Sequence, residues 1–262
     1  MLKNRLIPVL LLKDGLLVRS ERFSIHQVIG NPLEEVERFN EWNVDELIYL
    51  DINPHSTAQG HRSDHRVQIP HDPMTVLDAI SRSCFMPLTF GGGIRTLEDI
   101  RLRIAHGADK VSINAAALLD PEIITAAART FGSQAIVASM DAGTGESGER
   151  RVFAEGGARE TARCPVEWAV ELESRGAGEI LLQSVERDGS GLGYDLDLIH
   201  RVSSRVGIPV IACSGVGSFE HYARGIEAGA SAAAAANIWH FKELSDRKGK
   251  RALARAGVPV RL

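Results

Sequence analysis

The chain has 262 residues and a formal net charge of −4 at pH 7, with 44% hydrophobic and 24% charged residues. This composition excludes a disordered chain, and the small negative charge excludes nucleic-acid binding through bulk positive charge. No apolar run reaches the length of a membrane span, and the three scattered cysteines make neither a disulfide framework nor a zinc motif. We therefore expect a cytoplasmic protein without membrane contact, metal or cofactor.

Short apolar runs alternate with helical patterns along the chain. The expected strands cover residues 6–12, 46–51, 87–90, 110–113, 135–141, 179–184, 208–212 and 231–236. The expected helices cover residues 32–42, 74–83, 96–106, 121–131, 166–175, 196–206 and 219–228, and a charged helical tail begins at residue 241. Eight such units in a chain of this length predict an α/β fold, a single (β/α)8 TIM barrel over residues 1–262, although strict alternation also fits an open doubly wound sheet.

An internal repeat favours the closed barrel, built as two similar halves. The segment 45–48 resembles 178–181 at an offset of 133 (178 − 45), and 87–93 resembles 209–215 at an offset of 122 (209 − 87). The difference places about 11 extra residues in the first half, within the polar segment 53–73 after the second strand. This inserted loop falls at the C-terminal face, where barrel enzymes keep their chemistry. Its four histidines match no zinc spacing.

Glycine-rich segments follow the third and seventh strands, at residues 91–93 and 214–217. Glycine lets backbone N–H groups approach an anion closely, and a following helix N-terminus adds favourable potential. Their equivalent places in the two halves favour a ligand with a phosphate at each end over purely structural turns. The small eighth strand fits either tight packing or close approach of that ligand. The candidate phosphate-binding residues are Gly92, Gly93, Asn114, Asp188, Gly189, Gly215, Gly217, Ala236 and Asn237.

Longer ordered motifs resemble the cyclase-subunit family of imidazole glycerol phosphate synthase. The motifs are PLTFGGGIR at 87–95, GADKVSIN at 107–114, RGAGEILL at 175–182 and RDG at 187–189, together with RLIP at 5–8, KDG at 13–15 and the segment from DEL at 45–47 to Asp51. The resemblance implies the same barrel and a glutaminase partner docked on its N-terminal face. It also implies that ammonia travels along the barrel axis to cleave and cyclise a bis-phosphate substrate at the opposite face.

The resemblance implies two catalytic aspartates, at the ends of the first and fifth strands. The second is present as Asp141, but Leu11 stands at the first position. An isobutyl group exchanges no proton, so the acid–base pair is incomplete. We interpret Asp51, at the end of the second strand, as the best substitute, ahead of Asp14 and Asp188. Further departures from the family surround the same face, at Ala115, Gln183, Glu186, Ser214 and Asn237.

The resemblance also implies a ring of four charges at the entrance of the ammonia passage, which we call the charge ring. All four members are retained, as Arg5, Glu46, Lys110 and Glu179. Alternate barrel strands contribute one layer of inward side chains, so two cations and two anions can cancel there. We interpret the ring as a gate for ammonia, while a salt-bridged plug remains the structural alternative.

An intact charge ring beside an altered substrate face leads to our first hypothesis. The run Leu10-Leu11-Leu12-Lys13 resembles a branch of the family, and this resemblance implies that ammonia passes from a glutaminase to a third protein, a sugar amidotransferase of surface-polysaccharide synthesis. The chain would then deliver ammonia for amidation of a nucleotide-linked N-acetyl sugar. The alternative is a working cyclase subunit of histidine biosynthesis despite Leu11. A third hypothesis is a scaffold that joins glutaminase and transferase without passing ammonia.

Overall fold

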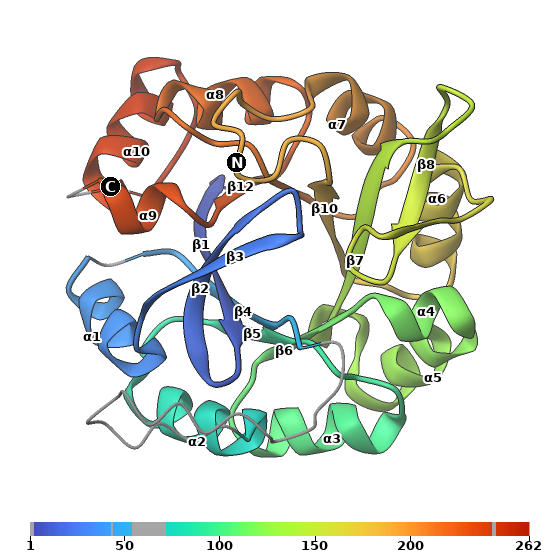
Figure 1. The fold of residues 1–262 in the computed structure, drawn as a ribbon, viewed down its shortest axis with the longest axis horizontal. Helices are drawn as coiled ribbons and strands as arrows, with labels where there is room; N and C mark the ends of the chain where they lie inside the picture. Colours follow the sequence, from blue (N-terminus) through green and yellow to red (C-terminus); the bar gives the residue numbers. More distant parts are fainter. Residues whose placement is uncertain (1–2, 43, 54–71, 243–244, 262) are drawn as a thin grey trace.

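Eight parallel strands close into a barrel in the computed structural model, which describes residues 3–42, 44–53, 72–242 and 245–261 (Figure 1). Each strand pairs with the next, and β12 pairs with β1 to close the sheet. The predicted (β/α)8 barrel is therefore confirmed, and the open doubly wound alternative is wrong. The barrel strands are β1 (Arg5–Lys13), β4 (Leu47–Asp51), β5 (Leu88–Gly91), β6 (Lys110–Ile113), β7 (Ile136–Thr144), β10 (Glu179–Ser184), β11 (Val210–Cys213) and β12 (Ala232–Ala235).

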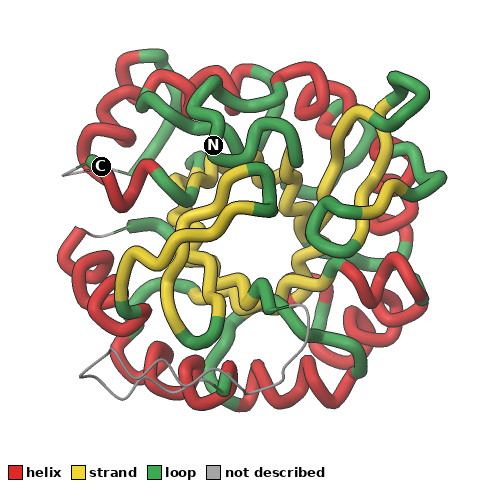
Figure 2. Tube along the Cα trace, viewed as in Figure 1, coloured by secondary structure: helices red, strands yellow, loops and turns green. Residues whose placement is uncertain are grey.

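Helices form a ring outside the strands (Figure 2). Local chemistry sets where they begin: at α3, Thr96 and Asp99 exchange side-chain and backbone hydrogen bonds in a capping box. The helices are α1 (Pro32–Trp42), α2 (Pro73–Ser83), α3 (Leu97–Ala105), α4 (Ala115–Leu119), α5 (Glu122–Phe131), α6 (Pro165–Ser174), α7 (Leu196–Ser203), α8 (Glu220–Glu227), α9 (Ile238–Phe241) and α10 (Ser245–Arg255), with a 3-10 turn at Ser133–Ala135. The short helices α4 and α9 were not among the predicted elements.

The core has two parts, which follow from the alternation of side chains along each strand. On β1, Ile7, Val9 and Leu11 point into the barrel and belong to the inner cluster. The intervening Leu10 and Leu12 point outward and pack with the helices in the larger cluster. The same parity decides which polar side chains on the other strands can reach the barrel interior.

Two antiparallel hairpins extend barrel strands beyond the closed sheet, and the sequence analysis missed both. Strands β2 (Leu16–Glu21) and β3 (Ile25–Gly30) continue from β1, and Figure 1 shows them crossing in front of the barrel opening. The turn between β1 and β2 has positive φ at Asp14 (53°) and Gly15 (75°), the backbone that a two-residue hairpin turn requires. The second hairpin pairs β8 (Arg150–Ala154) with β7 and with β9 (Arg159–Glu160).

Some expectations concern places where the structure says little. The predicted inserted loop, 53–73, lies outside the described residues except for Asn53, Asp72 and Pro73.

The second barrel strand, β4, begins one residue later than predicted, and Glu46 directly precedes it. Among the described helices, none combines the length and the apolar character needed to cross a membrane.

Candidate active site

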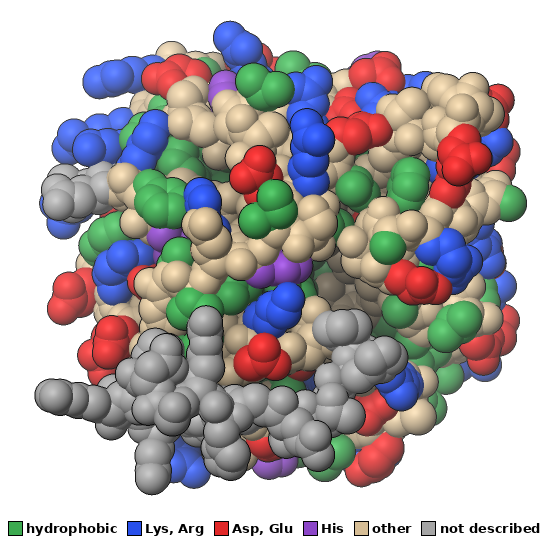
Figure 3. Space-filling view, in the orientation of Figure 1, with side chains coloured by type: hydrophobic (Ala, Val, Ile, Leu, Met, Phe, Trp, Pro, Cys, Tyr) green, Lys and Arg blue, Asp and Glu red, His purple; other side chains and the backbone are tan. Residues whose placement is uncertain are grey.

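A cavity of about 1660 Å³ opens at the carboxyl ends of the barrel strands. Figure 3 shows this face of the molecule hollowed near the barrel axis. Val9 and Leu11 of β1 lie in its wall together with both glycine-rich segments. Nearly all predicted substrate-face residues border it, namely Asp51, Gly92, Gly93, Asn114, Asp141, Asp188, Gly189, Gly215, Ala236 and Asn237. Gly217 is the exception.

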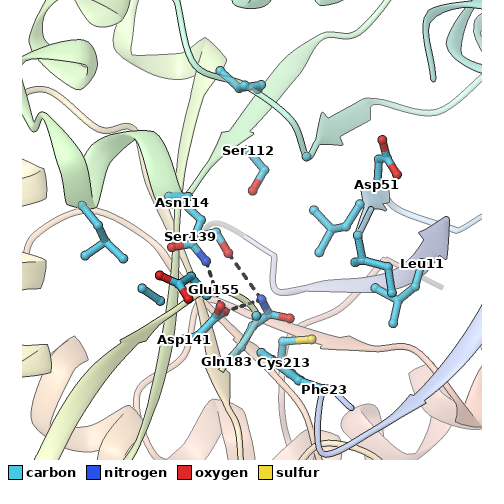
Figure 4. Close-up of a pocket in the computed structure, with 18 of the residues that line it drawn as sticks. Leu11, Phe23, Asp51, Ser112, Asn114, Ser139, Asp141, Glu155, Gln183 and Cys213 are labelled. Atoms are coloured by element: carbon cyan, nitrogen blue, oxygen red, sulfur yellow. Dashed lines mark hydrogen bonds between the residues drawn. The ribbon is translucent and has the colours of Figure 1, made fainter. Parts of the chain in front are cut away.

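Asp141 is the best-defined polar group in the cavity. Its Oδ2 accepts a hydrogen bond from Asn114 Nδ2 at 2.9 Å, and its Oδ1 accepts one from Gln183 Nε2 at 2.9 Å (Figure 4). The residue is only 4% exposed. Burial raises the pKa of Asp141 to about 6, against the two hydrogen bonds, which favour the ionised form. A carboxyl group with this pKa can give or take a proton near neutral pH.

The raised pKa makes a prediction for stability. Because the folded-state pKa of about 6 lies above the ordinary value of 3.8 for an unfolded chain, the folded chain holds this proton more tightly than the unfolded chain. The contribution of this proton to the free energy of unfolding is fully present below pH 3.8 and is lost as the pH rises through 6. We expect the unfolding free energy of Asp141→Asn, relative to the unsubstituted chain, to rise by about 2 kcal/mol between pH 4 and 7. Urea unfolding at several pH values measures it, and a difference independent of pH would contradict the assignment.

Leu11 lies near the carboxyl end of β1, and its side chain points into the barrel, across from Asp141 (Figure 4). It pairs in register with Leu50, and the two side chains belong to the inner apolar cluster. The wall of the cavity on this side is therefore apolar where the family resemblance implies a carboxylate.

The Asp51 carboxylate, the predicted substitute for the missing acid, does not face Asp141. Since Leu50 points into the barrel, the next side chain along β4 points to the other side of the wall. The Asp51 Oδ1 accepts hydrogen bonds from Asn53 N at 3.2 Å and Asn53 Nδ2 at 2.8 Å, and Figure 4 shows the carboxylate turned away from Asp141. Burial raises the pKa of Asp51. Asp51 thus borders the cavity without facing Asp141, which corrects the sequence interpretation.

The first glycine-rich segment, residues 91–93, is called the anion loop below. Gly92 has φ +100°, and a Cβ there would lie 2.0 Å from the Asp51 carbonyl oxygen. Gly93 has φ +64°. Only glycine satisfies both the backbone conformation and the close approach at position 92. The loop leads toward the capped start of α3, so its geometry fits an anion site.

The second segment differs from the prediction. Gly217 does not line the cavity: its N–H donates to His221 Nδ1 at 3.2 Å, and a Cβ there would lie 2.4 Å from the Gly191 carbonyl oxygen. Close packing therefore explains the glycine at position 217. Gly217 is no longer a candidate phosphate ligand. Gly215 does line the cavity, with φ +88°. Ser214 beside it has φ +79°, which is uncommon outside glycine.

Asp188 and Asn237 hold the first hairpin in place. The Asp188 Oδ2 accepts hydrogen bonds from Ser20 Oγ at 2.6 Å and from Phe23 N at 3.1 Å. Asn237 Nδ2 donates to the Ser20 carbonyl oxygen at 2.9 Å. Both predicted phosphate ligands therefore border the cavity while their side chains fasten the β2–β3 hairpin across its mouth.

The four charges at the opposite end of the barrel form a closed set of ion pairs. Arg5 lies 2.6 Å from Glu46 and 3.0 Å from Glu179. Lys110 lies 2.6 Å from Glu46 and 3.0 Å from Glu179. The Glu46 side chain is 2% exposed, and it also accepts a hydrogen bond from Thr89 Oγ1 at 3.4 Å. The geometry agrees with the predicted ring, and it is compatible with a plug as well as with a gate.

The sequence analysis missed several cavity residues. Ser112, Ser139 and Cys213 line the cavity because each lies on the inward-facing side of its strand. The alternation of side chains along the strand could have predicted them. His26 could not be found that way, because the β2–β3 hairpin that carries it was not predicted; its Nδ1 lies 3.3 Å from Lys13 Nζ in the cavity wall. No group of three or more His, Cys, Asp or Glu side chains suited to a metal occurs in the described part of the chain.

Comparisons with known proteins point to one family. Residues 5–245 match the model of a family described as "Histidine biosynthesis protein". A relative from Gluconacetobacter diazotrophicus, "Imidazole glycerol phosphate synthase subunit HisF", is 41% identical over 264 aligned positions, covering 100% of this chain and 97% of the relative. A relative of the same name from Caulobacter vibrioides is 42% identical over 267 positions, with the same coverage.

Proposed function

The chain belongs to the histidine biosynthesis protein family, and from that premise we propose that it is the cyclase-type subunit of a glutamine-dependent synthase. In this proposal a phosphorylated substrate binds at the cavity, and a partner glutaminase supplies ammonia from the other end of the barrel. The similarity to two HisF subunits over the full chain supports this assignment above the amidation of a sugar.

One observation carries the proposal. Asp141 is a buried carboxyl with a pKa near 6, held by two amide groups in a cavity bordered by two glycine-rich segments. The segments follow β5 and β11, which lie opposite each other in the strand order of the barrel. A ligand with a phosphate at each end would therefore cross the axis beside Asp141. The carboxyl is then placed to exchange a proton with the middle of the substrate.

The barrel interior supports the delivery of ammonia. Between the charge ring and the cavity lies a layer of apolar side chains that includes Ile7, Ile48 and Leu181. Neutral ammonia crosses such a layer at lower cost than ammonium, because burying an unpaired charge is expensive. The charge ring lies at the end of the axis away from the cavity, where the glutaminase would dock.

Leu11 favours a second candidate function. The apolar wall opposite Asp141 removes one member of the expected acid–base pair. In the second candidate, the chain delivers ammonia to a third protein that amidates a nucleotide-linked N-acetyl sugar, and performs little cyclisation itself.

The deciding experiment measures ammonium-dependent turnover of the bis-phosphate substrate of imidazole glycerol phosphate synthase. We expect Leu11→Asp to exceed the unsubstituted chain by about 10²–10⁴-fold, because it restores a proton-exchanging group. Leu11→Asn is the matched control: its side chain has the same size as aspartate but no carboxyl, so it should give no gain.

Each outcome separates the candidates. Gain with Leu11→Asp alone supports the cyclase-type cavity. Turnover by the unsubstituted chain equal to that of Leu11→Asp makes Leu11 a tolerated change and removes the sugar-amidation candidate. Absence of turnover in all three proteins, with folding verified by circular dichroism, contradicts the proposed substrate and favours the second candidate.

A further inference from the structure

Arg103 is a buried cation on α3 with no place in the function described so far. It is 7% exposed and lies behind the anion loop. Its Nη2 donates to the Gly92 carbonyl oxygen at 2.6 Å, and its Nη1 donates to the Asp99 carbonyl oxygen at 2.9 Å. Its Nε is buried and finds no acceptor within the described residues. A buried guanidinium in this position requires an explanation, because its desolvation is costly.

The bond to Gly92 fixes the direction of one peptide group. In a trans peptide, the C=O of one residue and the N–H of the next point in opposite directions. The Gly92 C=O points to Arg103, which does not border the cavity, whereas Gly92 and Gly93 both do. The Gly93 N–H therefore points away from Arg103, toward the cavity.

The positive charge of Arg103 also favours an anion at this loop. No carboxylate in the described part of the chain lies within ion-pair distance, 4.0 Å, of Arg103. Asp51 and Asp99 are close enough to favour its charged form, although burial lowers the pKa of Arg103. A phosphate bound at the anion loop would supply the missing negative charge on the other side of the Gly92–Gly93 peptide. The cost of burying Arg103 would then be offset by binding.

We propose that Arg103 is a positioning residue for the anion loop: it turns the Gly93 N–H toward the cavity and places a positive charge behind a bound phosphate. This inference rests on the phosphate site of the proposed function. Arg103 touches the loop backbone and never the ligand, so its effect on binding is indirect.

Inorganic phosphate is the probe, titrated into the full chain while the amide signals of Gly93 and Gly215 are followed by NMR. Gly215, on the opposite glycine-rich segment, is an internal control. We expect Arg103→Met to raise the phosphate dissociation constant reported by Gly93 about tenfold. The constant reported by Gly215 should stay unchanged. Arg103→Lys keeps the charge but loses the two-pronged donor, so it should weaken binding less than Arg103→Met.

Arg101→Met is the matched control, because it removes an arginine of the same helix that is 61% exposed, forms an ion pair with Glu98 and lies over the Phe131 ring. It should leave both glycine signals unchanged. If Arg103→Met is unfolded by circular dichroism, Arg103→Lys carries the test, and phosphate binding at Gly93 equal to the unsubstituted chain overturns the inference. Equal weakening at Gly93 and Gly215 also overturns it, because the effect would then be global. Failure of the unsubstituted chain to bind phosphate at Gly93 counts against the proposed function itself.

Discussion

Asp141→Asn is expected to lower ammonium-dependent turnover by about 10²–10⁴-fold, the range for loss of a positioned acid or base. The substitution keeps the size and shape of the side chain but removes the exchangeable proton. The Gln183 amide can turn to present its oxygen to the new NH2 group, so the cavity should keep its form. Turnover is measured with saturating ammonium, in the Leu11→Asp background if the unsubstituted chain is too slow.

Two further measurements test the role of Asp141: the pH–rate profile and the binding of phosphate. The limb of the pH–rate profile near pH 6 should disappear, because the group that titrates there is gone. The dissociation constant for inorganic phosphate should stay unchanged, since the carboxyl lies between the two glycine-rich segments. Glu98→Gln is the control: this carboxylate is 65% exposed on α3 and does not line the cavity, so turnover should change little. Equal losses in both variants would show that Asp141 has no special role.

The second large effect concerns the charge ring. Removing Glu46, which is 2% exposed, leaves Arg5 and Lys110 with Glu179 as their shared partner. Loss of one member of a buried ion-pair set costs about 3–5 kcal/mol, because the remaining charge stays buried. We expect Glu46→Ala to lower the melting temperature by roughly 10 °C, measured by differential scanning calorimetry.

The control for this prediction is Glu98→Ala, which removes an exposed ion pair with Arg101 and should cost less than about 1 kcal/mol. Glu46→Gln keeps the hydrogen-bond acceptor and removes only the charge, so its melting temperature should lie between the two. A Glu46→Ala melting temperature within one degree of the Glu98→Ala value would mean that the ring contributes little to stability.

Side-chain parity would have improved the analysis of the substrate face. If Glu46 points inward at the base of the barrel, then residues 48 and 50 also point inward, and residue 51 does not. The same rule takes Glu179 through Leu181 to Gln183, which bonds Asp141, and Lys110 through Ser112 to Asn114, its second partner. Both amide partners of Asp141 and the misplacement of Asp51 were therefore readable from strand spacing.

The barrel itself was predictable because it depends on local information. Alternating apolar strands and helices recur along the chain, and each unit has one face to bury, so closure satisfies all of them. The charge ring and Asp141 were identified through the family resemblance, and strand periodicity adds only that their side chains point inward. The β2–β3 hairpin escaped, although Asp14-Gly15 is a hairpin turn sequence, because its strands lie outside the strand–helix alternation.

Tertiary structure alone decided the direction of particular groups. Gly92 and Gly217 look alike in sequence, yet one borders the cavity and the other packs against Gly191 with its N–H bonded to His221. Arg103 reads as one more cation on an amphipathic helix, and only the packing of α3 behind the anion loop directs it to the Gly92 carbonyl. Periodicity along a chain specifies which face a side chain occupies, whereas the neighbour that face meets is set by segments distant in sequence.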